Sequence, residues 1–313
     1  MKILITGGAG FIGSHTVDKL INSGYDVCIV DNLSTGNEKN LNTKAKFYNL
    51  DIRDEKIADI FKKEKFDAVF HFAAQINVRK SVENPSFDVD VNVNGTINII
   101  TNFLKYGKGR KFIFSSTGGA IYGETNVIPT PENVIPYPLS PYGISKLTVE
   151  KFLNYYAYFN NLEYVVLRYG NVYGPRQNPY AEAGVIAIFI GKILKGTNCT
   201  IYGSGNQTRD FVFIDDVVKA NLLCFEKNIS GIFNVGTEKE TSVNQILNYL
   251  KIISGKNVKT VYAEKKEGDI ERSCLSVEKI NKEIGWKPEV NIEKGLEKTY
   301  RWFEKFFKPK RSG

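Results

Sequence analysis

The chain has 313 residues and a mass of 35.3 kDa, enough for one large α/β domain or two coupled domains. Its apolar share of 42% and charged share of 24% are ordinary for a globular protein and exclude a disordered, collagenous or coiled-coil chain. The net charge of +8 is spread along the sequence without a basic run interleaved with aromatic residues, so we expect no nucleic-acid partner.

Membrane, secreted and metal-binding classes are disfavoured in the same way. The longest uncharged apolar run, residues 183–191, is less than half of the ~18–20 residues that span a bilayer. Residues 2–6 lead directly into a glycine turn, so we expect no signal peptide. Four scattered cysteines and two histidines suggest neither a disulfide framework nor a metal site. We therefore expect a cytoplasmic protein with no membrane partner and no bound metal.

The first half of the chain alternates between short apolar runs and longer amphipathic segments. We expect strands at residues 3–6, 27–30, 68–72, 111–115 and 164–168, and helices at 11–23, 55–64, 86–106 and 142–159. Such runs form βαβ units, which build a parallel sheet with helices on both faces. After residue 168 the chain is richer in turns, and we expect helices at 242–254, 277–284 and 293–307. The predicted fold class is α/β, with a doubly wound parallel sheet.

A glycine-rich turn lies between the first predicted strand and the first predicted helix. Gly7, Gly10 and Gly13 have the spacing G-x-x-G-x-x-G, which permits a tight turn and a close backbone approach to a pyrophosphate. The helix that follows directs free N–H groups and its positive dipole end toward the phosphates. This context predicts a Rossmann-type dinucleotide site, with a plain glycine-rich turn as the alternative.

Asp31 favours NAD over NADP at this site. It follows the second apolar run, where a carboxylate accepts hydrogen bonds from both ribose hydroxyls and repels a 2′-phosphate. Residues 32–34 contain no arginine that would attract that phosphate. Asp51 and Ile52 end the next apolar stretch and are candidates for holding the adenine, although Asp51 also suits an ordinary turn.

Tyr142 and Lys146 are at positions i and i+4 and share one face of a predicted helix. A lysine cation, helped by a positively charged nicotinamide, favours a phenolate, so we expect a lowered pKa and a role as base for Tyr142. Thr117 follows a predicted strand at the ligand crevice, and its hydroxyl can bridge a substrate hydroxyl to Tyr142. Ser115 and Ser116 better suit local backbone hydrogen bonds.

Several segments together resemble the extended short-chain dehydrogenase/reductase superfamily: residues 6–13, Asp31, 71–74, 92–96, 115–117, 142–146 and 167–177. Within it the chain is similar to the UDP-glucose 4-epimerase family over essentially its full length. The resemblance implies an NAD-binding Rossmann domain at 1–168, to which 211–235 returns, and a smaller nucleotide-sugar domain at 169–210 and 236–313. It also implies a homodimer formed through two helices of each subunit.

The resemblance also assigns roles to single positions. Tyr142 is implied to be the catalytic base, and Thr117 supplies the hydroxyl group that acts with it. Lys146 is implied to shift the pKa of Tyr142 and to bind the nicotinamide ribose. The positions expected to line NAD are Gly7, Gly10, Phe11, Ile12, Gly13, Asp31, Asn32, Leu33, Ser34, Thr35, Gly36, Asp51, Ile52, Phe72, Ala73, Ala74, Gln75, Asn92, Ser115, Tyr142, Lys146 and Tyr169. Those expected to bind the nucleotide sugar are Thr117, Tyr142, Asn171, Val185, Tyr202, Arg209, Lys266, Asp269 and Arg272.

Three of the substrate-side positions carry particular expectations. The Arg209 guanidinium can fork onto phosphate oxygens, with a salt bridge to Asp210 as the alternative. Lys266 stands where the family usually has an arginine, which puts bidentate phosphate binding in doubt there. Ser273 falls where a bulky residue in the family limits the group at the sugar C2, so we expect a pocket that also admits an N-acetyl group.

The expected function is NAD-dependent 4-epimerisation of a UDP-hexose through a transient 4-keto intermediate. The alternatives are a UDP-glucuronate epimerase, a 4,6-dehydratase or decarboxylase, and a non-catalytic NAD sensor. A dehydratase or decarboxylase carries acidic residues directly after the threonine, where this chain has Gly118, Gly119 and Ala120. A sensor tends to lose the Tyr/Lys pair, which is present here.

We expect the homodimer contact on helices 86–106 and 142–159. These helices carry more apolar and aromatic positions than one sheet face can cover. Leu153, Tyr156 and Phe159 are the predicted contact residues, with packing inside the monomer as the alternative.

Overall fold

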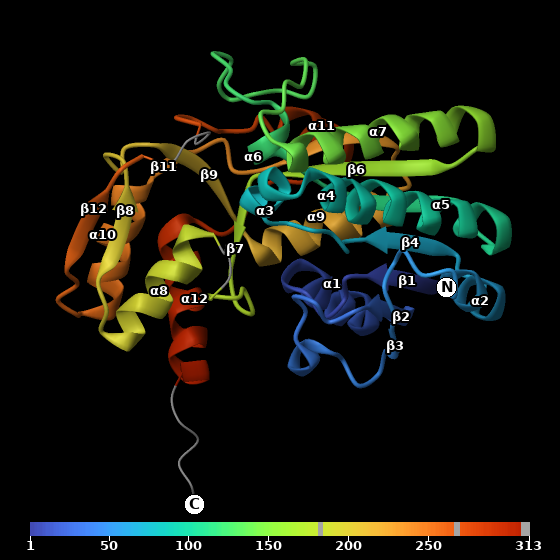
Figure 1. Cartoon of the computed structure of the whole chain (residues 1–313), viewed down its shortest axis with the longest axis horizontal. Coiled ribbons are helices and arrows are strands. Elements are labelled where there is room, and N and C mark those ends of the chain that lie inside the picture. The colour runs from blue at the N-terminus through green and yellow to red at the C-terminus, as the bar shows by residue number, and fades with distance from the viewer. Residues whose placement is uncertain (181–183, 266–269, 308–313) are drawn as a thin grey trace, which may run out of the picture.

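A seven-stranded parallel sheet forms the centre of the larger lobe (Figure 1). In this computed structural model, which describes all residues except 181–183, 266–269 and 308–313, the strand order is β10-β6-β5-β4-β1-β2-β3. The strands are β1 (Lys2–Thr6), β2 (Asp26–Asp31), β3 (Lys46–Asn49), β4 (Ala68–His71), β5 (Lys111–Thr117), β6 (Glu163–Tyr169) and β10 (Gly231–Val235). Every neighbouring pair is parallel, so the carboxyl ends of all strands lie at one edge. The predicted α/β class is confirmed.

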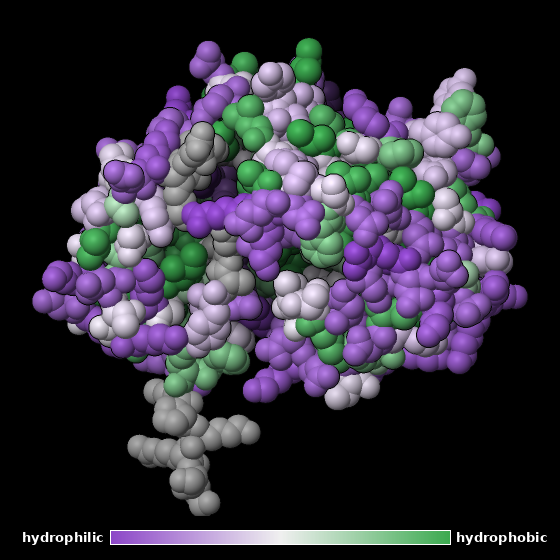
Figure 2. Space-filling view, in the orientation of Figure 1, coloured by the Kyte–Doolittle hydropathy of each residue, from purple (hydrophilic) through white to green (hydrophobic). Residues whose placement is uncertain are grey.

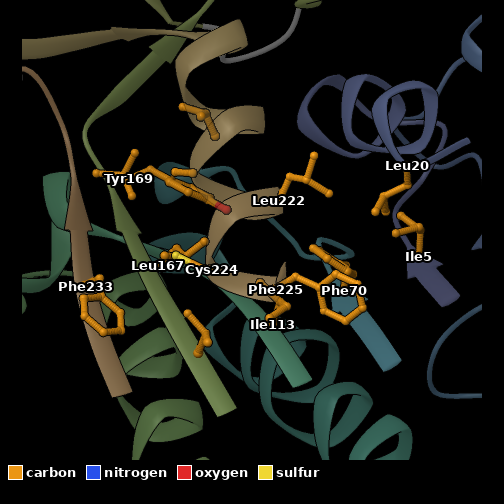
Figure 3. Close-up of a cluster of buried hydrophobic side chains, with 14 of the residues drawn as sticks. Ile5, Leu20, Phe70, Ile113, Leu167, Tyr169, Leu222, Cys224, Phe225 and Phe233 are labelled. Atoms are coloured by element: carbon orange, nitrogen blue, oxygen red, sulfur yellow. The ribbon is translucent and has the colours of Figure 1, made fainter. Parts of the chain in front are cut away.

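Helices cover both faces of this sheet. They are α1 (Phe11–Asn22), α2 (Ile57–Glu64), α3 (Val78–Glu83), α4 (Pro85–Val89), α5 (Gly95–Tyr106), α6 (Gly118–Ile121), α7 (Pro141–Asn160), α9 (Ile214–Glu226) and α11 (Glu278–Ile284). Ile3 and Ile5 pack into a cluster with α1 and α9, whereas Leu4 between them packs into a second cluster with α2, α5 and α7. The alternation of side chains along β1 thus produces one core on each face. Figure 3 shows the first of these clusters.

A smaller lobe lies beside the carboxyl ends of the strands (Figure 1, left). It contains α8 (Val185–Lys195), α10 (Val243–Ser254) and α12 (Ile292–Phe307), together with β7 (Asn171–Tyr173), β8 (Cys199–Tyr202), β9 (Thr208–Phe213), β11 (Glu240–Ser242) and β12 (Thr260–Ala263). These strands form a sheet in the order β11-β9-β7 and a pair β12-β8. A third hydrophobic cluster, with Phe189, Phe213 and Phe303, holds the lobe together.

The chain crosses between the lobes several times. After β9 it enters α9, which packs beside α1, and then β10, which pairs with β6 at the edge of the central sheet. The chain then returns to β11 and α10. This path agrees with a return of residues 211–235 to the first domain, except that residues 211–213 belong to β9 of the smaller sheet. We propose the two-domain division with that boundary moved to the start of α9 and with α11, which packs against β10, returned to the first domain.

Most expected elements are present, and the differences are local. The segment 86–106, expected as one helix, consists of α4, a π-helical turn (Asp90–Asn94) and α5. A 3-10 turn (Glu38–Asn40), β3, α3, α6, α8, α9, β10 and the strands of the smaller lobe were not expected. In the described part of the chain, no helix is long and apolar enough to cross a membrane. All four cysteines are buried and free of disulfides.

Candidate active site

The glycine turn after β1 packs so closely against neighbouring backbone that its glycines cannot carry side chains. Gly7 has a φ of +71°, and a Cβ there would lie 2.6 Å from the backbone nitrogen of Ala73. A Cβ on Gly13 would lie 2.1 Å from the carbonyl oxygen of Gly7. Gly10 caps α1 without a side-chain hydrogen bond, so the first-turn N–H groups, including those of Phe11 and Ile12, are available to an anion. The turn fits a pyrophosphate.

Asp31 is held beside this turn at the carboxyl end of β2. One of its carboxylate oxygens accepts from the Ala9 N–H (3.0 Å) and the other from the Leu33 N–H (2.8 Å). Burial raises its pKa, and those two hydrogen bonds oppose the shift. Gly36 approaches so closely that an added Cβ would lie 2.9 Å from Asp31 Oδ1. Residues 32–36 therefore wrap around the carboxylate that was expected to hold the ribose.

Asp51 lies next to this loop, as the sequence suggested. Its carboxylate accepts from Asn32 Nδ2 (2.8 Å) and from the Arg53 guanidinium, with Nε and Nη2 both at 2.9 Å. Hydrogen bonds from Arg53, the largest effect, hold its pKa at about 2. Ile52 is buried and packs against α5 at Gly95. The two residues thus border the outer end of the site.

The segment after β4 forms the inner wall and is clamped by Asn92. The Asn92 side chain accepts from the Gln75 N–H (2.8 Å) and donates to the Gln75 carbonyl (2.9 Å) and to Asp88 Oδ1 (3.0 Å). Asn92 belongs to the π-helical turn, an irregularity that often occurs at functional sites. It therefore contributes by fixing the segment that starts at Phe72, Ala73 and Ala74, and its own amide is engaged within the protein.

A directed chain of hydrogen bonds runs through His71 beneath this wall. The Thr96 hydroxyl donates to the Asn92 carbonyl (2.6 Å), so it accepts from His71 Nε2 (2.9 Å). His71 Nδ1 then accepts from the Thr6 hydroxyl (2.8 Å). Burial, and next the charge of Lys146, lowers the pKa of His71 to about 3, which keeps the imidazole neutral. The chain joins the glycine turn to the π-helical turn.

Tyr142 and Lys146 lie in the first two turns of α7, facing the end of β5. Pro141 occupies the first turn, and the capping Ser140 hydroxyl accepts from the Gly143 N–H (3.2 Å). The Lys146 ammonium donates to the Ser115 carbonyl (3.0 Å) and lies 5.9 Å from the centroid of the Tyr142 ring. The predicted juxtaposition of phenol and ammonium is present.

The proton affinities of this pair differ from the sequence expectation. Burial raises the pKa of the Tyr142 phenol, and the negative charge of Asp88 raises it further. Burial also lowers the pKa of Lys146 to about 8, against the opposing charges of Asp88 and Glu150. The lowered pKa that the sequence predicted for Tyr142 is therefore not found in the protein alone, where burial and Asp88 have the opposite effect.

Thr117 and Asn171 converge above Gly119. A Cβ added to Gly119 would lie 3.5 Å from Asn171 Oδ1 and 4.0 Å from Thr117 Oγ1. Thr117 is paired with Tyr169 in the register of β5 and β6, and Asn171 follows two residues later. The Tyr169 ring lies in the core, where its hydroxyl donates to Asn221 Oδ1 (2.6 Å) on α9 (Figure 3). Ser116 is also turned inward and donates to Glu150 (2.6 Å).

The remaining substrate-side positions line the smaller lobe. Val185 begins α8, Tyr202 ends β8, and Arg209 lies on β9, where its Nη1 donates to the Thr208 carbonyl (2.8 Å). The described hydrogen bonds of the Asp210 carboxylate go to the N–H and hydroxyl of Thr237 and the N–H of Leu275, with a weak contact to the Cys274 thiol. Lys266 and Asp269 lie outside the described residues.

Sequence reasoning missed two buried carboxylates around the catalytic pair. Asp88 is fully buried, and its Oδ2 has no hydrogen-bond partner among the described residues. Glu150 forms a bidentate pair with Arg168, with N–O distances of 3.1 and 2.6 Å. The sequence could have indicated Glu150, because it lies one helical turn after Lys146. Asp88 is remote from Tyr142 in the sequence, and no sequence pattern indicates that the two residues are close.

Comparison with known proteins identifies the family of the chain. A family model described as the NAD dependent epimerase/dehydratase family matches residues 3–236. The chain belongs to this family. The match spans the glycine turn, Asp31, Thr117 and the Tyr142–Lys146 pair, and the family uses NAD as its cofactor.

Named relatives of the family cover nearly the whole chain. The UDP-glucose 4-epimerase of Thermotoga maritima, solved with UDP-glucose, is 49% identical with a TM-score of 0.95, covering 98% of this chain and 99% of that one. The UDP-glucose 4-epimerase of Thermus thermophilus, solved with NAD, is 40% identical with a TM-score of 0.93, covering 97% and 99%. The UDP-glucose 4-epimerase of Mycolicibacterium smegmatis is 38% identical over 309 residues, 97% of this chain and 98% of its own.

Proposed function

We propose that the protein interconverts UDP-hexoses that differ in configuration at C4, with UDP-glucose and UDP-galactose as substrates. The observation that carries the proposal is the Tyr142–Lys146 pair, which faces the Thr117 end of β5 beside a turn shaped for a dinucleotide. The three relatives reported above, which are 38–49% identical over 97–98% of the chain, are UDP-glucose 4-epimerases, which are isomerases. The protein is accordingly an NAD-dependent isomerase.

Each side chain of the site has its own role in the proposed reaction. Tyr142 takes the proton from the sugar O4 and later returns it, and Thr117 bridges that hydroxyl to the phenol. The Lys146 ammonium, fixed by the Ser115 carbonyl, stabilises the phenolate. Bound NAD supplies the acceptor and donor for the C4 hydride. Arg209 and Arg272 hold the diphosphate while the sugar turns over, and the net redox change is zero.

A dehydratase or decarboxylase fits the site less well. Such enzymes need an acid and a base beside C5 and C6, directly after the threonine. At Gly118 a Cβ would lie 2.4 Å from Cδ1 of Leu275, which is itself buried, so there is no room for an acidic side chain. Gly119 and Ala120 provide no titratable group. The geometry therefore favours epimerisation.

The experiment is incubation of the purified protein with UDP-galactose and, separately, with UDP-glucose, without added NAD. Sugar-nucleotide chromatography should show each substrate converting into the other, because the cofactor is regenerated in every cycle. A dehydrated or decarboxylated product would identify one of the alternative enzymes. Absence of any conversion after NAD has been added would support a non-catalytic sensor.

We also propose that the pocket admits an N-acetyl group at C2. The supporting observation is the small Ser273, which is 9% exposed and whose N–H donates to the Thr208 carbonyl (3.2 Å), on the strand that carries Arg209. Replacing Ser273 with Tyr should lower kcat/KM for UDP-N-acetylglucosamine and spare UDP-glucose, as measured by coupled assays on both sugars. Equal losses on both sugars, or none, would show that Ser273 does not set the pocket size.

Two further proposals concern the oligomeric state and the cellular location of the enzyme. We propose a homodimer formed on the face of α5 and α7, where aromatic side chains of α7 are exposed. Leu153, one of the expected contact residues, is fully buried in the core of its own chain and is not available. We propose a cytoplasmic location on the basis of the four unpaired cysteines.

A further inference from the structure

The backbone of Thr208 brings both candidate diphosphate ligands together at the start of β9. Its carbonyl accepts from Arg209 Nη1 (2.8 Å) and from the Ser273 N–H (3.2 Å), and its N–H donates to the Glu271 carbonyl (2.9 Å). Thr208 and Arg272 form an isolated parallel bridge. Segment 271–273 is thereby fixed along the start of β9, with the backbone of Arg272 paired with that of Thr208, the residue before Arg209.

Glu240 on β11 then fixes the Arg272 side chain. Arg272 Nε donates to Glu240 Oε1 (2.9 Å), and Nη2 donates to Oε2 (2.6 Å). The Thr208 hydroxyl donates to the same Oε1. Glu240 reaches this place because β11 pairs with β9 in antiparallel register, with Ser242 opposite Thr208. Hydrogen bonds from Arg272 hold the pKa of Glu240 below its usual range, so it remains a carboxylate at neutral pH.

This pairing uses one edge of the guanidinium and leaves another for a ligand. A guanidinium has five N–H groups in a planar fork, and the bonds to Glu240 occupy Nε and one proton of Nη2. The Nη1 group and the second Nη2 proton form a separate fork, whose geometry matches two phosphate oxygens. The Arg272 side chain is 58% exposed, so without Glu240 it would sample many rotamers before binding.

We propose that Glu240, supported by Thr208, is a positioning residue that holds Arg272 ready to bind the diphosphate of the nucleotide sugar. The proposal rests on the proposed function, in which Arg272 binds that diphosphate. The opposite effect is physically open, since a carboxylate close to a phosphate also repels it. Removing the Glu240 charge therefore distinguishes the two effects. The affinity for the diphosphate falls if Glu240 positions Arg272, and it rises if repulsion dominates.

The test is Glu240→Gln in the NAD-loaded enzyme, with the KM for UDP-galactose and the calorimetric Kd for UDP as readouts. If Glu240 positions Arg272, both constants should rise about three- to tenfold while kcat stays within about twofold. Thr208→Val should raise them in the same direction by a smaller factor, and Thr208→Ser, which keeps the hydroxyl, should restore them. Unchanged or lower constants in Glu240→Gln would overturn the proposal.

Two controls separate this proposal from the function on which it rests. Glu289→Gln makes the same chemical change at an exposed ion pair with Lys219 and should alter neither constant. Arg272→Met should weaken UDP binding at least as much as Glu240→Gln. If Arg272→Met binds UDP normally, the diphosphate role and this proposal both fail, whereas epimerisation by the wild type still upholds the proposed function. If Arg272→Met weakens binding and Glu240→Gln does not, only the positioning role fails.

Discussion

Tyr142 shows how a single residue depends on its surroundings for its chemistry. Burial and the charge of Asp88 both favour the protonated phenol, while Lys146 at 5.9 Å from the ring favours the phenolate. A base of this kind is active only when cofactor and ammonium outweigh the buried carboxylate. In the protein without a cofactor, burial and Asp88 prevail, and the pKa of Tyr142 lies above its usual range.

Removing the phenolic oxygen should abolish turnover without unfolding the protein. Tyr142→Phe keeps the aromatic ring and leaves the backbone bond from the residue 142 N–H to the Ser81 hydroxyl (3.1 Å) intact. We expect kcat to fall by about 10²–10⁴-fold, the usual contribution of an acid–base group, with the bound NAD content unchanged. The two measurements are initial rates on UDP-galactose and release of NAD on denaturation. A variant of near-normal activity would place the base elsewhere.

Asp88 should set the pH range in which Tyr142 works. Its Oδ2 is buried without a hydrogen-bond partner in the described part of the chain, while its Oδ1 accepts from Gln75 Nε2 (2.8 Å) and Asn92 Nδ2 (3.0 Å). The Asp88 charge raises the pKa of Tyr142, so Asp88→Asn should lower that pKa. Because activity rises with pH as the phenol loses its proton, the acidic limb of the kcat profile should move to lower pH.

Asp90→Asn is the matched control for this shift. Asp90 lies two residues further along the chain, but its carboxylate is exposed and pairs with Arg53 (2.7 Å). It should leave the position of the acidic limb unchanged. An unshifted limb in Asp88→Asn would show that its charge does not reach the phenol in the working enzyme.

At the scale of elements, the sequence predicts what depends on local pattern. The strands β1, β2, β4, β5 and β6 and the helices α1, α2, α5 and α7 were expected because apolar runs, glycines and helix spacing are local signals. The strands β7, β8, β11 and β12 were not, because three or four residues form a strand only when a distant partner pairs with them.

The same distinction applies to the candidate site. Glycine spacing and the i, i+4 spacing of Tyr142 and Lys146 are readable from neighbours in the chain. The contacts of Asp88, Glu240 and Arg168 come from elements that meet only in the folded protein. Tyr169 illustrates the limit, since the predicted strand ended at residue 168 and Tyr169 was expected to line NAD, whereas the inward direction of its side chain depends on α9.

Glu64 should stabilise one edge of the sheet in a pH-dependent way. It lies on α2 and accepts from Lys2 of β1 (2.8 Å), from Lys46 of β3 (2.6 Å) and from the Tyr48 hydroxyl. Burial raises its pKa, but these bonds outweigh it and hold the pKa at about 2, below the usual 4.5. A carboxyl with a depressed pKa stabilises the folded state above the unfolded value and loses that contribution as pH falls from 4.5 to 2.

Glu64→Gln should therefore lower the free energy of unfolding by about 1–3 kcal/mol at pH 7, because it removes the charge that pairs with two ammonium groups. Urea unfolding at pH 7 and at pH 3 should show that the deficit narrows in acid. Asp59→Asn, on the same helix but exposed and paired with Lys62, is the control and should change little. A deficit of the same size at both pH values would rule out the charge as its origin.

At the scale of the whole molecule, buried polar residues fix the strands and segments that border the site. Asp210 of β9 accepts from Thr237 and Leu275, and Tyr122 links Arg168 to Asn234 of β10 with bonds of 2.8 Å each. These contacts bring the segment with Arg272 and Ser273 close to the strands that carry Thr117 and Asn171. The residues proposed to bind the nucleotide sugar and those near the reacting C4 are therefore held in fixed positions relative to one another.

The exposed aromatic end of α7 should form the contact between two subunits. Tyr155, Tyr158 and Phe159 are 51%, 80% and 64% exposed, and their rings contact one another at 4.8–4.9 Å between centroids. Figure 2 shows hydrophobic residues spread over the face where α4, α5 and α7 lie. Such a patch on a helix pair suits a self-complementary contact across a two-fold axis.

Light scattering at micromolar concentration should give twice the 35.3 kDa mass of one chain. The double change Tyr158→Glu and Phe159→Ser should shift the mass toward the monomer, because it places a charge in an apolar contact. The control is Ile252→Glu, which also adds a charge at an exposed apolar residue (71% exposed) but lies on α10 of the smaller lobe, so the dimer mass should persist. A monomeric wild type would contradict the dimer, and a dimer that survives the change on α7 would move the contact to another face.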